Sequence, residues 1–365
     1  MWRFESPCLV TNSAPSLAAL AQQLALVSPV HWRHLRLQRL PDKGLAHDHV
    51  RLVGTGLLAR IPKQSQMQLG ALDNLQYQAA CFERAWAGGH TPRLDRFLLP
   101  SDQLPRGALL VQEIIGRAAR LPDDLPAITL ALASLHCLPL PPAGLRAPLW
   151  DSADPLASLR DEILVQSRYA AAANLEPATA QALQTGLAAL QVACEGQNRP
   201  PRQLIAFDGH PGNFVVQADG KAMLVDLEKC RYSYAGLDLA HATLYTSTTW
   251  DLASHAVLSL DQVRDVYRRW EVAVGSATAQ AARAWHLPLR RAMWLWSITW
   301  CAKWRVLSSQ TAQANPHGED WSQERSDAAL VAHVRDRVDH YLSSAVVALV
   351  LTEFAQLELA LQSPC

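Results

Sequence analysis

The feature that most limits how this chain can fold is a short β-forming island inside a long helical region. Beyond Gly116 the hydrophobic spacing predicts helices at about 123–138, 156–171, 177–194, 261–274, 279–308 and 325–361. Residues 204–227 break this pattern with two apolar strands, 213–216 and 222–225, joined by an Ala218-Asp219-Gly220 turn. This half of the chain is therefore predicted to be a helical lobe that carries one β-hairpin.

The part of the chain before Gly116 has a different texture. The strands predicted there are 49–53, 57–61, 94–99 and 108–115. A helix at about 70–87 lies between the second and third strands, and a helical lead-in is predicted within residues 1–30. With 365 residues the chain is long enough for two lobes. We therefore expect an α+β protein with a β-rich N-lobe, residues 1–115 including the helical extension, and a larger helical C-lobe, residues 116–365.

Composition excludes several classes of protein. The 33 basic and 33 acidic side chains balance, so no polyanionic partner such as nucleic acid is expected. The seven cysteines are scattered and form no C-x-x-C pair, which is typical of free thiols in a reducing compartment. The N-terminus lacks the layout of a signal peptide, and the apolar run 345–351 is too short to span a bilayer. We expect a cytoplasmic protein without a membrane partner; the oligomeric state stays open.

The island holds three oxygen-bearing side chains at a suggestive spacing. Asp208 and Asn213 form D-x-x-x-x-N, and Asp226 ends the next strand, so a hairpin would bring all three to one end. Phosphoryl transfer needs a carboxylate beside the acceptor hydroxyl, and oxygen ligands for Mg²⁺. We predict Asp208 as the catalytic base and Asn213 and Asp226 as Mg²⁺ ligands. Alternatively, Asp208 caps a turn, Asn213 starts a strand and Asp226 ends one.

The same segment resembles the aminoglycoside phosphotransferase and choline/thiamine kinase-like superfamily. That family shows H-G-D-x-H-x-x-N, then a strand ending I-D-[FWL]-E, then D-L-A. The matching residues here are Asp208, His210 and Asn213, then Val225-Asp226-Leu227-Glu228, then Asp238-Leu239-Ala240. Weaker matches, in the right order, are Leu58–Pro62, Leu110–Gly116 and Leu132–Pro139. The resemblance covers roughly residues 40–245 and implies a protein-kinase-like two-lobed fold.

By this resemblance the protein is a small-molecule kinase that uses Mg²⁺ and ATP or GTP. Arg60 would pair with the nucleotide phosphates, and Gln78 lies nearest the place of the helix glutamate that partners this strand base. The glycine-rich loop is reduced to the segment around Gly44. The hinge at Glu113 and Ile114 would offer backbone groups to adenine or guanine.

The chain departs from the family pattern just before the predicted base. Ala206 stands where the family has histidine, and Phe207 stands where it has glycine. The missing histidine at position 206 and the missing helix glutamate favour a second hypothesis, a catalytically weak pseudokinase that binds a nucleotide or a partner. The intact Asp208, Asn213 and Asp226 oppose it.

The acceptor is predicted to be a small molecule bound by segments after Asp226. Trp296, Trp300 and Trp304 form a stripe at helical spacing, which is either core or an aromatic wall for a cationic acceptor. The polar loop 246–251 ends in Trp250 and Asp251, which we expect to line the acceptor site; the loop could equally open the next helix. An amino alcohol, aminoglycoside, sugar or vitamin-like compound would fit this class.

Overall fold

A computed structural model of the chain describes residues 17–27, 32, 35–41, 44–310, 319, 321 and 326–362. Of the helical lead-in predicted within residues 1–30, Leu17–Val27 forms helix α1, and the remainder lies outside the described residues. Lys43, the neighbour of the predicted loop glycine, also lies outside them.

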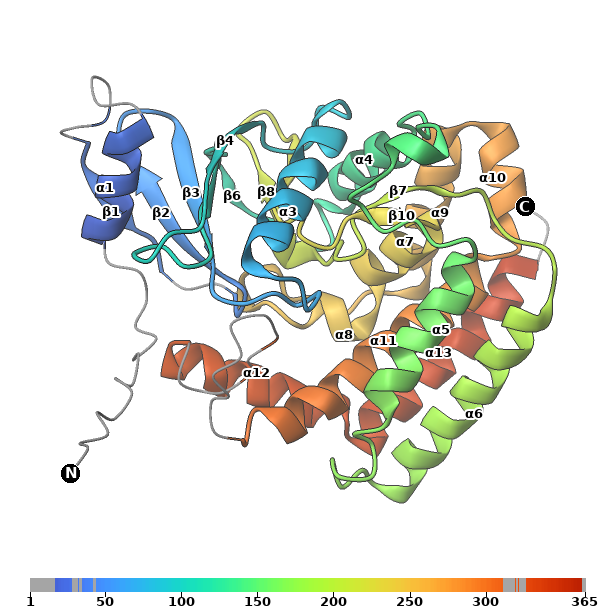
Figure 1. Cartoon of the computed structure of the whole chain (residues 1–365). Coiled ribbons are helices and arrows are strands. Elements are labelled where there is room, and N and C mark those ends of the chain that lie inside the picture. The colour runs from blue at the N-terminus through green and yellow to red at the C-terminus, as the bar shows by residue number, and fades with distance from the viewer. Residues whose placement is uncertain are drawn as a thin grey trace, which may run out of the picture.

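The N-lobe is built on one antiparallel five-stranded sheet in the order β1-β2-β3-β5-β4. Its strands are β1 (Leu37–Arg39), β2 (His47–Leu52), β3 (Leu57–Pro62), β4 (Leu94–Leu98) and β5 (Ala108–Gln112). Alternate residues of β5 face opposite sides, so Leu110 packs with α1 while Leu109 packs with α3 (Ala71–Trp86). The expected β-rich lobe is confirmed, and Figure 1 shows it at one end of the molecule.

The C-lobe is helical, as the sequence predicted. Its longer helices are α4 (Leu125–His136), α5 (Pro155–Ser167), α6 (Pro177–Glu195), α7 (Ala235–Thr243), α9 (Leu260–Val274), α10 (Ser276–Arg283), α11 (His286–Leu307), α12 (Ala328–Tyr341) and α13 (Ser344–Gln362). A four-residue helix, α8 (Tyr245–Thr248), follows α7. In Figure 1, α5, α6, α11 and α13 lie together at the end opposite the sheet. They bury one continuous apolar core, to which α11 contributes more large side chains than any other described helix.

Two predicted helices are each divided in two. The predicted helix 279–308 is interrupted at Ala284-Trp285, between α10 and α11. The predicted helix 325–361 breaks at Leu342-Ser343, where Ser343 starts α13 by accepting a hydrogen bond from the backbone of Val347. The hydrophobic repeat runs across both breaks, which is why the spacing alone did not locate them.

No single helix in the described ranges is long and apolar enough to cross a membrane. Helices α12 and α13 satisfy the length and composition criteria only as a pair, which is bent by 62°. Apolar side chains of both helices, among them Val338 and Phe354, are buried in the helical core.

The predicted hairpin forms, with additional strands beside it. Strand β8 (Phe214–Val216) pairs with β9 (Ala222–Leu224), and the short β6 (Arg117–Ala118) adds to the other edge of β8. A separate pair joins β7 (Gln203–Ile205) to β10 (Arg231–Ser233). Strand β7 leads directly into the loop that carries Asp208, so these two small sheets position the predicted chemistry.

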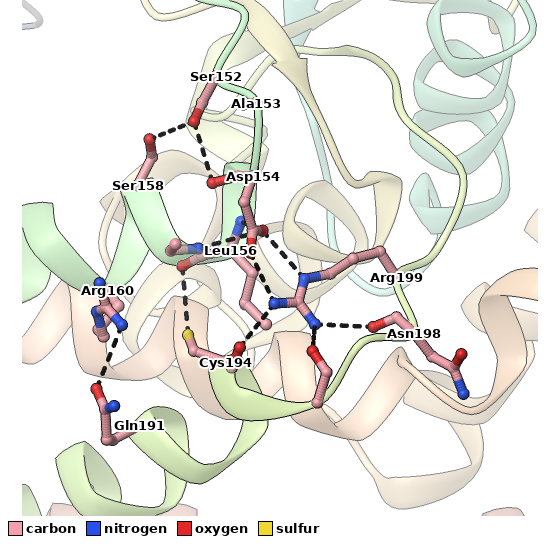
Figure 2. Close-up of polar contacts among 12 residues, drawn as sticks. Ser152, Ala153, Asp154, Leu156, Ser158, Arg160, Gln191, Cys194, Asn198 and Arg199 are labelled. Carbon is pink, nitrogen blue, oxygen red and sulfur yellow. Dashed lines mark hydrogen bonds and ion pairs between the residues drawn. The ribbon is translucent and has the colours of Figure 1, made fainter.

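The segment before β7 is tied to the start of α5, as Figure 2 shows. Asp154 caps α5 by accepting hydrogen bonds from the backbone N–H groups of Leu156 and Ala157, and it also pairs with Arg199. The hydrogen bonds from Arg199 are the largest influence on the carboxyl and lower the pKa of Asp154. This ion pair fixes the path of the chain as it approaches β7.

Candidate active site

The loop that follows β7 is held by one buried carboxylate. Asp238, in the first turn of α7, is fully buried and accepts hydrogen bonds from the backbone N–H groups of Ala206 and Phe207, both at 2.8 Å. It also accepts from His136 Nε2 at 3.0 Å, while His136 Nδ1 accepts from the indole N–H of Trp270. Because the indole only donates, His136 carries its proton on Nε2. This network anchors the loop although residue 206 is alanine.

Phe207 adopts a backbone conformation that favours glycine, with φ of +61°. Its N–H donates to Asp238, and its ring is buried against Trp296, with ring centroids 5.2 Å apart. The guanidinium carbon of Arg231 lies 3.7 Å from the ring centroid on the β10 side. Packing and hydrogen bonding thus offset a strain of about 1–3 kcal/mol at the residue before Asp208.

Asp208 itself is surrounded by basic groups. Its Oδ2 lies 2.7 Å from Lys229 Nζ, and its Oδ1 lies 3.7 Å from His241 Nδ1 and 4.0 Å from His210 Nε2. Burial acts to raise the pKa of Asp208, but the lysine and the two histidines outweigh it and bring the pKa below its usual value. Asp208 is therefore a carboxylate at neutral pH, the state that a proton acceptor requires.

The structure brings Asn213 and Asp226 to the same place as Asp208. The Asn213 side-chain amide donates to the backbone carbonyl of Asp208 at 2.8 Å, which leaves its amide oxygen as the atom for a cation. The Asn213 carbonyl accepts from Val225 N–H at 2.9 Å, extending the ladder between β8 and β9 up to Asp226. Asn213 lies opposite Val225, the residue before Asp226, so the Asn213 amide oxygen and the Asp226 carboxylate lie close together. Such oxygen ligands suit Mg²⁺, a hard cation.

Arg60 joins the two lobes at this point. It is buried on β3, donates from Nη1 to the Val225 carbonyl at 2.9 Å and pairs through Nη2 with Asp226 at 2.7 Å. Burial acts to raise the pKa of Asp226, but the Arg60 charge outweighs it and the pKa lies far below its usual value. Lys63, the other basic residue near this strand, pairs with Asp48. Arg60, which is predicted to bind phosphate, thus forms an ion pair with Asp226, which is predicted to bind the metal.

A second group of polar residues lies beside this ion pair. Gln78 is buried, and its Oε1 hydrogen-bonds to His47 Nε2 at 3.0 Å, so its hydrogen bond goes to His47 and not to Arg60. His47 Nδ1 lies 3.8 Å from Glu228. Burial, and after it the nearby Asp226 charge, raises the pKa of Glu228 to about 8. The side chains of His47, Asp226 and Glu228 are close enough to hold one metal ion together.

The remaining predicted nucleotide residues lie around the sheet. Gly44 lies in the connection between β1 and β2, with open space where a Cβ would be. The Glu113 N–H donates to the carbonyl of Gly56, and its side chain pairs with Arg51, so its own carbonyl is the group that a base could meet. Ile114 follows at the start of the connection to the C-lobe.

The two predicted acceptor residues have different surroundings. Asp251 lies against the catalytic loop: a Cβ on Gly212 would come within 2.9 Å of Asp251 Oδ2, so a larger residue at 212 would have to displace the Asp251 side chain. The ring of Trp250 instead packs with Trp300 and Tyr341, at 5.8 and 6.2 Å between ring centroids. Trp250 therefore belongs to an aromatic cluster, whereas Asp251 lies beside the catalytic loop at Gly212.

Two residues beside Asp208 were not singled out from the sequence as site residues. Lys229 directly follows the Asp226-Leu227-Glu228 motif, and its position next to that motif was the available signal. The helical spacing identifies Trp296 only as one member of a stripe, and the structure shows that its ring contacts Phe207 and His241. Trp304, two turns further along α11, is buried in the helical core.

Comparison of the fold with solved structures identifies kinases that act on small molecules. The GDP complex of aminoglycoside 2'-phosphotransferase-IIIa aligns with a TM-score of 0.57 and 13% identity, over 89% of this chain and 98% of that chain. An ethanolamine kinase from Plasmodium vivax aligns with a TM-score of 0.59 and 12% identity, over 92% and 90%. A choline/ethanolamine kinase family protein from Mesorhizobium loti gives 0.53 and 16%, over 93% and 99%. These likenesses establish the protein-kinase-like two-lobed fold.

The sequence itself assigns the chain to a family. No curated protein sequence matches it. The family model of phosphotransferase enzymes, however, matches residues 39–273, which include strands β2 to β5, the hinge, the catalytic loop and Asp238. Since this match spans more than half of the chain, the protein belongs to the phosphotransferase enzyme family.

Proposed function

We propose that this phosphotransferase is a kinase that moves the γ-phosphoryl group of ATP or GTP to a hydroxyl on a small molecule. The observation that carries the proposal is that Asp208, Asn213 and Asp226 lie together on neighbouring backbone segments. Arg60 of the N-lobe sheet pairs with Asp226 at the same place. Base, metal ligands and a phosphate-binding cation are the parts that phosphoryl transfer requires.

In the proposed step, the acceptor oxygen forms a bond to the γ-phosphorus while the bond from this phosphorus to the bridging oxygen breaks. The electron pair of the broken bond leaves with the nucleoside diphosphate, and the hydroxyl proton passes to Asp208. Asn213 and Asp226 would hold Mg²⁺, which neutralises charge on the phosphates when it is bound. Arg60, freed from Asp226 in part, would add a second positive charge there.

The nucleotide would lie under the N-lobe sheet. The Glu113 carbonyl and the backbone of Ile114 would meet the base, and the loop at Gly44 would cover the phosphates. The role of Gln78 in this proposal is indirect, because it holds His47 beside Glu228. We place the division between the lobes at residues 115 and 116, in the connection between β5 and β6.

The acceptor would approach Asp208 from the C-lobe, past Asp251 and Trp296. The solved kinases of similar fold are described as acting on aminoglycosides, choline or ethanolamine, and such hydroxylated compounds are the first to test here. Asp251, which is partly exposed beside the catalytic loop, could pair with an amine on the acceptor.

A transfer screen tests the proposal. The purified protein is supplied with Mg-ATP or Mg-GTP and with aminoglycosides, choline, ethanolamine, thiamine, sugars and amino alcohols, and phosphorylated products are measured by mass spectrometry. Asp208→Asn is the matched control, with the same shape and no base. The proposal fails if no acceptor gains phosphate, or if Asp208→Asn keeps the wild-type rate.

The second candidate, a pseudokinase, has one observation in its favour. Both functional carboxylates are already paired with protein cations, Asp226 with Arg60 and Asp208 with Lys229. A protein that binds Mg-nucleotide in calorimetry but yields no phosphorylated product, and releases no phosphate to water, would support this second function.

A further inference from the structure

Lys229 is a buried lysine with no place in the roles assigned above. The residue is 8% exposed, and its Nζ hydrogen-bonds to Asp208 Oδ2 at 2.7 Å. The same ammonium lies 5.4 Å from the centre of the Trp296 ring, a distance suited to cation–π attraction. Because burying an ammonium is costly unless it is paired, the negative charge of Asp208 stabilises Lys229 in this position.

The pairing of β7 with β10 brings Lys229 next to Asp208. In that antiparallel pair Ile205 lies opposite Arg231. Continuing the chain forward from Ile205 and backward from Arg231 brings Asp208 and Lys229 towards each other. A turn closed by the Cys230 N–H to Leu227 carbonyl hydrogen bond sets the lysine between the metal-binding segment and the catalytic loop. The contact is thus fixed by backbone pairing.

This contact makes the two oxygens of Asp208 unequal. Oδ2 is engaged by the ammonium, whereas the groups nearest to Oδ1, His241 and His210, lie at 3.7 and 4.0 Å, beyond hydrogen-bond length. A carboxylate with one oxygen held cannot rotate freely about its χ2 angle. Oδ1 is consequently the oxygen that can face an acceptor hydroxyl and take its proton.

We propose that Lys229 is a positioning residue for phosphoryl transfer, which acts by holding Asp208 through Oδ2 so that Oδ1 receives the proton of the acceptor. This role rests on the proposed function, because it requires Asp208 to be the base. It predicts that Lys229 contributes to the rate only while residue 208 is a carboxylate. It also predicts no direct contribution of Lys229 to nucleotide binding.

A double-mutant cycle tests this role with Lys229→Met, Asp208→Asn and the double variant. The readout is release of inorganic phosphate from Mg-ATP with water as acceptor, so the natural acceptor need not be known. Lys229→Met should lower kcat by about 10²-fold with an unchanged KM for Mg-ATP, because the base is retained but misplaced. In the Asp208→Asn background the same substitution should change kcat less than about threefold, the non-additivity expected of residues that act as a unit.

Controls separate positioning from folding. Lys221→Met removes a lysine from the β8–β9 turn of the same hairpin and should leave kcat unchanged. The double variant buries neither charge, so urea unfolding should show it more stable than Lys229→Met alone. In Lys229→Ala, added ethylammonium should restore part of the lost rate by filling the vacated ammonium position, which a purely structural role would not allow.

The outcomes separate the proposed function from the proposed role of Lys229. A wild-type protein that releases no phosphate and phosphorylates no acceptor contradicts the proposed function. An active wild type in which Lys229→Met stays within threefold of the normal kcat overturns the role of Lys229 alone. Losses that multiply in the double variant, or a weaker Mg-ATP affinity that accounts for the whole effect, also overturn it, because Lys229 would then act on the nucleotide.

Discussion

Replacing Asp238 by asparagine, a side chain of nearly the same shape, should weaken the hydrogen bonds that hold the catalytic loop. The carboxylate is fully buried and accepts three N–H groups, from Ala206, Phe207 and His136. Asparagine offers one oxygen, so when that oxygen serves Ala206 and His136, its NH₂ group faces the N–H of Phe207. The Phe207 N–H and the amide NH₂ that faces it are then unpaired with each other, and the other two bonds lose the help of a negative charge.

The cost follows from these bonds. An unpaired buried donor costs about 1–3 kcal/mol, and two charge-assisted bonds reduced to neutral ones lose about 1–3 kcal/mol together. The expected loss of stability is therefore about 4 kcal/mol, a large part of the roughly 5–15 kcal/mol typical of folded proteins. Phe207 should aggravate the effect, because its left-handed backbone, at φ +61°, depends on this hydrogen bond.

Urea unfolding followed by tryptophan fluorescence measures this loss, with phosphate release from Mg-ATP as a second readout. Asp265→Asn is the control, since this exposed residue pairs with Arg269 one turn away on α9 and should cost no more than about 0.5 kcal/mol. A loss below about 1 kcal/mol for Asp238→Asn would refute the reasoning, because the loop would then be held by other contacts.

Three further outcomes are expected. Asp208→Asn should lower phosphate transfer by about 10²–10⁴-fold and leave Mg-ATP affinity in calorimetry unchanged, since the lost group acts on the acceptor. Asp226→Ala should remove the Mg²⁺ dependence of nucleotide binding; unaltered Mg-ATP affinity would show that the metal is held elsewhere. Hydrogen bonds from His286 and Arg283 outweigh burial and lower the pKa of Glu271 from 4.5 to about 2, so its stabilisation is present above pH 4.5 and is lost as the pH falls towards 2. Glu271→Gln should flatten that acid dependence in unfolding measured from pH 6 to pH 2.

Much of the acceptor side could not be predicted, because it depends on which face of a helix meets which loop. Trp250 and Asp251 are neighbours in the sequence, yet one ring packs with Trp300 and Tyr341 while the other side chain touches the catalytic loop at Gly212. The direction of the backbone after α8 turns the two side chains to different sides, and no local sequence pattern predicts that direction.

The sequence by itself determined the β-rich and helical halves, the hairpin that ends at Asp226, and the grouping of Asp208 with Asn213. These features are local. They depend on strand and helix periodicity, on turn residues, and on the small number of residues that a hairpin spans. A family resemblance built on the same short motifs extended this to the whole fold.

Only the tertiary structure decided which charges meet. Arg60 pairs with Asp226 across 166 positions of the chain, and Asp238 reaches back to the backbone before Asp208 from a different helix. Lys229 meets Asp208 because two strands pair in one register, although nothing in the spacing of the two residues requires it. Electrostatic attraction depends on the distance between two charges and on their burial, and neither quantity can be read from their separation in the sequence.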